Sequence, residues 1–169
     1  MTLNGMKHAL IMSVILFVAA NVLADQSKPL FIIRRTKNIN EVHYDVNIGP
    51  DGKLDPKQPV VAYWIMSAKD GHREKLGFFE KKAYGFKCKY DTAKGMCRLV
   101  IRSFKQRQME VSGTKDGATA EMVIDGKPAY LEKMFIAESE GKPIPKVRSI
   151  ELFGKDKLSG KNVYEKISL

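Results

Sequence analysis

The sequence predicts a mainly β protein: a single antiparallel barrel or sandwich of about eight strands with one short α-helix. Residues 41–48 alternate between polar and apolar side chains, which is typical of a strand with one buried face. Short segments of strand character recur over residues 86–168 and are separated by turn-forming residues. A lipocalin-like barrel is one form of this class, and it has room for one small ligand.

The first 24 residues are expected to form a secretory signal peptide. Lys7 precedes the apolar run 9–20, and Val-Leu-Ala at 22–24 fits cleavage after Ala24. The run is shorter than the about 20 residues that a membrane-spanning helix needs. No cysteine occupies position 25, so a lipoprotein is not expected. We therefore expect residues 25–169 to form one β-rich domain, periplasmic or extracellular, without a transmembrane anchor.

The chain is strongly basic. Its 169 residues include 29 Lys or Arg and 19 Asp or Glu, which gives a net charge of +10. Such a surface attracts phospholipid headgroups, anionic polysaccharides or nucleic acid, although it can also serve solubility alone. Lysines occur in nearly every expected loop, which predicts a general positive field. Export makes nucleic acid an unexpected partner.

Cys88 and Cys97 flank residues 89–96, a segment with the composition of a hairpin turn. Export to an oxidising compartment makes a disulfide between them the default expectation. A loop this short predicts a stabilisation of about 2–3 kcal/mol. Two free thiols or a metal pair are the alternatives, but no histidine lies nearby in the sequence to support zinc binding.

The first half of the chain is expected to contain three strands, at Leu30–Thr36, Glu41–Ile48 and Pro59–Met66. The third is the most apolar stretch after the N-terminus and holds the only tryptophan, so we expect it at the centre of the fold. Glu74–Tyr84 predicts a short helix that Gly85 ends, because apolar residues recur near helical spacing at Leu76, Phe79, Ala83 and Phe86.

The second half is expected to be a run of strands. An Asp-Gly pair at 125–126 predicts a two-residue hairpin turn. The expected strands are Phe86–Tyr90, Met96–Phe104 with a continuation or bend over Lys105–Ser112, Ala118–Ile124, Pro128–Ala137, Lys146–Phe153 and Asn162–Ser168.

Several local strings occur together in a familiar order. They are FIIRRTKN at 31–38, VHYDVN at 42–47, GKLD at 52–55, Pro-Val at 59–60 followed by Tyr-Trp-Ile at 63–65, and AYGF at 83–86. In this order the chain resembles a family of exported domains, domain-of-unknown-function family 4833. The resemblance implies no activity, substrate, cofactor or catalytic residue. It implies only that the quoted strings belong to a shared core.

The sequence offers few catalytic groups after residue 24. It has two histidines, His43 and His72, and it lacks the HExxH, GxSxG and phosphate-loop motifs. His43 lies between Glu41 and Asp45 on a polar strand face, where it could act as a base, but a solvated face explains it equally simply. We therefore predict no catalytic residue, no metal site and no cofactor.

The candidate ligand-binding residues are aromatic or cationic: Arg34, Tyr44, Tyr63, Trp64, Tyr84, Arg98 and Arg102. The rings suit the mouth of a ligand cavity, or they fill the core, which is the favoured interpretation for Trp64.

Two pairs of arginines carry the cationic part of this expectation. Because Arg34 and Arg35 are adjacent on a strand, one must face inward, and it then needs an anionic partner: Asp45, Glu80 or a ligand. Arg98 and Arg102 share one face and could hold an anion, or they are ordinary exposed charges.

The expected function is that of a non-enzymatic module. It would bind a small amphipathic or anionic ligand, or an anionic surface of the cell envelope. Two alternatives remain: an envelope enzyme that uses His43 with the neighbouring carboxylates, and an interaction or inhibitor protein that acts through an exposed edge strand.

Overall fold

The computed structural model describes residues 27–36, 38–139 and 146–169, and the expected signal peptide at 1–24 lies outside them. Within these ranges the chain forms eleven strands and one helix: β1 (Ser27–Arg35), β2 (Asn38–Asn47), β3 (Val60–Ile65), β4 (Arg73–Lys75), α1 (Phe78–Ala83), β5 (Phe86–Asp91), β6 (Met96–Ile101), β7 (Met109–Thr114), β8 (Gly117–Ile124), β9 (Lys127–Glu138), β10 (Val147–Asp156) and β11 (Asn162–Ser168). None of the described helical residues forms a helix long and apolar enough to cross a membrane. The prediction of a mainly β protein with one short helix is confirmed.

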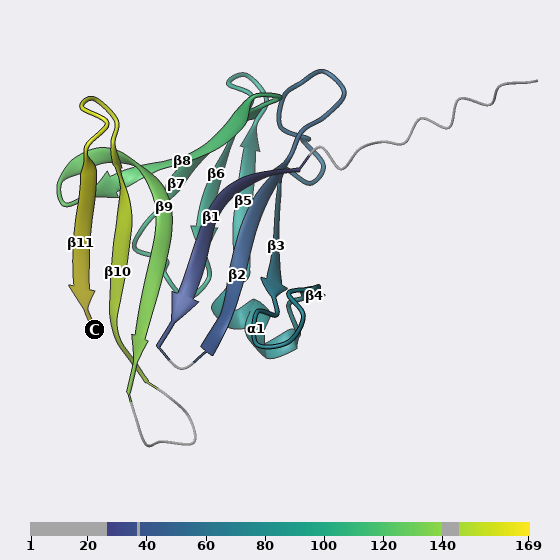
Figure 1. Cartoon of the computed structure of the whole chain (residues 1–169). Coiled ribbons are helices and arrows are strands. Elements are labelled where there is room, and N and C mark those ends of the chain that lie inside the picture. The colour runs from purple at the N-terminus through teal and green to yellow at the C-terminus, as the bar shows by residue number, and fades with distance from the viewer. Residues whose placement is uncertain (1–26, 37, 140–145) are drawn as a thin grey trace, which may run out of the picture.

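All eleven strands belong to one sheet, which curls into an open half-barrel (Figure 1). Nine strands follow the order β4-β3-β2-β1-β9-β8-β7-β6-β5, and β10 and β11 branch from β9. The two ends of this path, β4 and β5, do not pair with each other in the described part of the chain. The architecture therefore lies between a closed barrel and a sandwich, with one wall of β1–β4 and another of β5–β8.

Strand β9 joins the two walls. Its residues 127–130 pair with β8, and residues 133–136 pair in parallel with residues 32–35 of β1. Its other edge pairs with β10 along residues 129–138. The expectation that Pro59–Met66 forms the centre is wrong, because this segment forms β3, the second strand from one end of the path.

The turn between β8 and β9 has the predicted form. Asp125 and Gly126 have φ angles of 50° and 72°. Two successive positive φ angles are the signature of a two-residue turn whose twist matches that of the flanking strands. The Asp-Gly hairpin predicted from the sequence is confirmed.

The predicted helix over Glu74–Tyr84 is shorter than expected. Its first residues form β4, and α1 begins only at Phe78. The backbone N–H of Gly77 donates to the Glu80 carboxylate and caps the first turn. The helix ends before Gly85, where a Cβ atom would overlap the carbonyl oxygen of Lys81. Phe79, expected on the apolar face, instead points to solvent.

Aromatic rings fill the space between the two walls. Tyr44 is fully buried, and its ring stacks on Phe31 with a centroid distance of 4.4 Å. The Tyr44 hydroxyl donates a hydrogen bond to the backbone carbonyl of Tyr84, which follows α1. Burial, together with the neighbouring Tyr84 phenol, raises the pKa of Tyr44 far above its ordinary value, so the hydroxyl stays a donor. This bond ties the middle of one wall to the start of the other.

The predicted disulfide between Cys88 and Cys97 is present, with a Cα–Cα distance of 5.9 Å. The two residues are diagonal neighbours on the inner face, because Cys88 lies opposite Leu99 and Cys97 lies opposite Tyr90. A disulfide is compatible with an exported protein.

Gly154 provides a test of how β9 and β10 fit together. It lies at a register shift, and a Cβ atom there would overlap the carbonyl oxygen of Tyr130 and come within 2.9 Å of Ile124. We expect Gly154→Ala to lower the free energy of unfolding by about 1–3 kcal/mol. Gly117→Ala is the control, since a Cβ atom there meets no heavy atom within 4 Å. Equal denaturant midpoints for the two variants would contradict this account.

Candidate functional site

The outer face of β5 and β6 carries a concentration of cations. Side chains alternate along both strands, so Lys87 and Lys89 of β5 and Arg98 of β6 point outward while the cysteines point inward. In the antiparallel register Lys89 lies directly opposite Arg98, and Lys87 lies opposite Val100. Like charges directly opposite each other destabilise a sheet.

These side chains form a groove of about 460 Å³, called here the basic groove. After β6 the chain turns, and the buried ring of Phe104 anchors this turn. The groove is lined by Lys87, Cys88, Lys89, Arg98, Val100, Arg102, Lys105 and Gln108. Five of these residues are cationic and none is acidic. The lining can therefore hold an anionic group by charge-assisted hydrogen bonds.

Some cations outside the groove pair with carboxylates. Examples are Lys157–Glu121 at 2.6 Å, Lys155–Glu132 at 3.2 Å and Lys166–Glu151 at 3.6 Å. Among the described residues, none of the five groove cations has a carboxylate within 4 Å. Their charge is therefore available to a partner outside the chain.

The positive charge is not spread evenly, in contrast to the general field expected from the sequence. Residues 78–109 contain nine Lys or Arg residues and two acidic residues, Glu80 and Asp91. Both acids serve backbone groups: Glu80 caps α1, and Asp91 accepts hydrogen bonds from the N–H groups of Ala93 and Lys94. This one segment accounts for most of the net charge of the chain.

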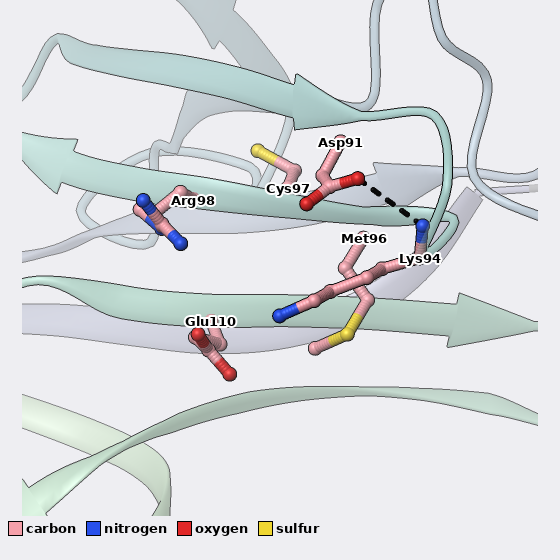
Figure 2. A pocket seen from close by; sticks show the side chains of 6 residues that line it. All are labelled: Asp91, Lys94, Met96, Cys97, Arg98 and Glu110. Carbon is pink, nitrogen blue, oxygen red and sulfur yellow. Dashed lines mark hydrogen bonds between the residues drawn. The ribbon is translucent and has the colours of Figure 1, made fainter.

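A smaller hollow lies beside the groove, between β6 and β7 (Figure 2). Its volume is about 20 Å³, which is room for about one water molecule. Arg98 and Glu110 face each other here across the strand pair, without an ion pair within 4 Å. The hollow is too small for a ligand, and Glu110 marks the acidic border of the basic groove.

The two adjacent arginines of β1 have separate roles, away from the groove. Arg34 is exposed and pairs with Glu41. Arg35 faces inward, where its guanidinium lies 5.0 Å from the ring centroid of Trp64 and 5.7 Å from that of Tyr84. Its carboxylate partner is Glu138, at 3.9 Å. The sequence had suggested Asp45, Glu80 or a ligand as the anionic partner, and the carboxylate found beside Arg35 is instead that of Glu138.

The four candidate aromatic residues also lie outside the groove. Tyr44, Trp64 and Tyr84 belong to the hydrophobic core. Tyr63 lies on the outer face of β3, where its hydroxyl donates to Asp45 at 2.6 Å. Their part in ligand binding stays a prediction.

Of the candidate residues, only Arg98 and Arg102 meet in the basic groove. Sequence reasoning missed Lys87, Lys89 and Lys105. The low number of acids over residues 78–109 is the signal that could have found them.

His43, the candidate base, forms a pair with one carboxylate. Its Nε2 lies 2.9 Å from Glu41, and its ring stacks on Tyr63 at 5.8 Å. Asp45 is buried and is engaged with Tyr63 and Arg73. Across residues 27–36, 38–139 and 146–169, no three acidic, histidine or cysteine side chains are placed to hold a metal ion.

Glu41 makes the stability of this surface sensitive to acid. Burial alone would raise its pKa, but hydrogen bonds from His43 and Arg34 and the charges of both outweigh burial and hold the pKa below its ordinary value of 4.5. A lowered pKa in the folded state contributes stability above the unfolded value, and this contribution is lost as the pH falls through the folded value.

We therefore expect Glu41→Gln to be less stable than the wild type by about 0.5–1 kcal/mol at neutral pH. The difference in stability should close as the pH falls from neutral through the lowered, folded-state pKa of Glu41, where the wild-type carboxylate becomes protonated. Urea unfolding of both proteins across this pH range measures it. A gap that stays constant with pH would contradict the assignment.

One of three comparisons with known proteins finds a match, and that match spans nearly all of this fold. Neither a curated protein nor a solved structure matches the chain. A family model described as Domain of unknown function (DUF4833) matches residues 31–166, from within β1 to within β11, and this range includes the basic groove. Because the match covers well over half of the sequence, the chain belongs to the DUF4833 family.

Proposed function

We propose that this domain is a non-enzymatic binding module that holds an anionic group in the basic groove. The observation that carries the proposal is the direct opposition of Lys89 and Arg98, with three further cations beside them and no carboxylate in the lining. Such an arrangement is unfavourable in the unliganded protein, and a bound anion would neutralise it.

The lining also bears on the kind of anion. Arginine offers a planar set of donors that matches phosphate and carboxylate groups, and Arg98 and Arg102 lie two positions either side of Val100. Val100 and the alkyl stems of the lysines give the groove an apolar floor. A volume of about 460 Å³ falls in the range of small-ligand sites. These features support an anionic or amphipathic ligand, such as a component of the cell envelope that an exported protein would meet.

Charge reversal tests the proposal. The soluble probe is inositol hexakisphosphate, which carries many phosphates and no apolar part. We expect the double variant Arg98→Glu/Arg102→Glu to bind it at least about tenfold more weakly than the wild type in calorimetry at moderate ionic strength. The loss should shrink as salt rises, because salt screens both proteins.

The control variant is Arg148→Glu/Lys161→Glu, which makes the same change in net charge outside the groove. It should bind the probe with nearly wild-type affinity. Equal losses in the two double variants would mean that the general field binds the probe, and the groove would be rejected. Absence of binding by the wild type would reject the proposed function itself.

A further inference from the structure

Helix α1, next to the Arg102 end of the groove, carries an exposed aromatic pair. Phe78 and Phe79 are adjacent on α1, and they are 72% and 78% exposed. Their rings lie edge to face with centroids 5.4 Å apart. The ammonium group of Lys82 lies 4.8 Å from one ring centroid and 5.6 Å from the other. Two adjacent phenylalanines this exposed are a candidate contact surface.

This pair, called here the aromatic tip, adjoins the basic groove. The backbone N–H of Arg102 donates to the carbonyl of Gly85 at 2.8 Å, and the Ser103 hydroxyl donates to the carbonyl of Ala83. The Arg102 end of the groove is thereby fixed against the end of α1. Figure 1 shows α1 next to the start of β5.

We propose that the anionic partner is a lipid bilayer surface: the aromatic tip inserts among the lipids while the basic groove binds their phosphate headgroups. This inference rests on the proposed function of the groove. The Lys82 ammonium lies beside both rings, so apolar and positive groups occur side by side, as they do on surfaces that bind anionic membranes.

The composition of this surface favours a bilayer over a protein partner. Lysine is depleted in the core of protein–protein interfaces, whereas Lys82 lies beside the two phenylalanines and three further lysines line the groove. A bilayer interface accepts both at once, because rings enter the acyl boundary while ammonium groups stay at the level of the phosphates. Because each signal alone gives weak and reversible binding, stable attachment needs both.

Vesicle flotation tests this inference. The protein, as the cell processes it, is mixed with vesicles of phosphatidylcholine with or without 30% phosphatidylglycerol. We expect binding only to the anionic vesicles. Phe78→Ser/Phe79→Ser should reduce the partition coefficient at least about tenfold and leave the binding of inositol hexakisphosphate unchanged. The wild type and all variants have the same N-terminus, so a contribution of the N-terminus to vesicle binding cannot cause a difference between them.

Val123→Ser/Leu158→Ser is the matched control. It removes two other exposed apolar side chains, which are 50% and 90% exposed and lie outside the tip and the groove. This variant should partition like the wild type. Emission from the single, buried Trp64 reports whether each variant is folded.

The outcomes separate the two proposals. If the wild type binds inositol hexakisphosphate but not anionic vesicles, the bilayer inference is overturned and the anion-binding groove stands. If the aromatic-tip variant floats as well as the wild type, the tip has no role in attachment. Binding to a single-stranded oligonucleotide instead of vesicles, with the same dependence on Phe78 and Phe79, would replace the bilayer by nucleic acid.

Discussion

The architecture depends on the backbone hydrogen bonds of β9. Each peptide group of a buried strand needs a partner, and β9 finds its partners in β10 on one edge and in β8 and then β1 on the other. The same edge of β9 thus pairs first with β8 and then, further along, with β1. The sheet divides at this point, and its two walls can fold toward each other over a shared core. Since residues 32–35 pair with residues 133–136, the start of the described chain is tied to its last third.

Side chains of the described residues pack the two walls against each other. The walls meet through side chains: Tyr44 reaches the backbone of Tyr84, and a Cβ atom on Gly113 would lie only 2.8 Å from Leu54. The Arg35 guanidinium also points into this space, where it contacts the Trp64 ring and the Glu138 carboxylate. The groove with unpaired charge lies instead on the convex face of β5 and β6. Lys87, Lys89 and Arg98 point outward from the two strands, and Arg102 and Lys105 join them from the turn after β6.

Local features of the fold were predictable from the sequence. The alternation in residues 41–48, the Asp-Gly turn and the cysteine hairpin depend on neighbours in the chain, and each was predicted correctly. The central place of β9 was not predictable, because it results from pairing with β1 about 100 residues away. Glu138 as the partner of Arg35 was missed for the same reason.

The candidate site was predicted only in part. Arg98 and Arg102 were expected to share a strand face from period-two alternation, but β6 ends at Ile101 and Arg102 reaches the groove from the turn that follows. Lys87 and Lys89 join them only through the register of β5 on β6, which sequence alone does not fix. The helical periodicity around Phe79 misled the prediction, since a six-residue helix has no apolar face long enough to require burial.

The disulfide gives this surface a dependence on the redox state of its surroundings. Strand β5 is an edge strand with β6 as its one partner among the described strands, and edge strands open readily. The link between Cys88 and Cys97 lies on the inner face of the same two strands, behind Lys89 and Arg98. It holds the two cations in register even when the hydrogen bonds of the edge open. A reduced chain carries the same charges, but only the backbone hydrogen bonds between β5 and β6 then hold their spacing.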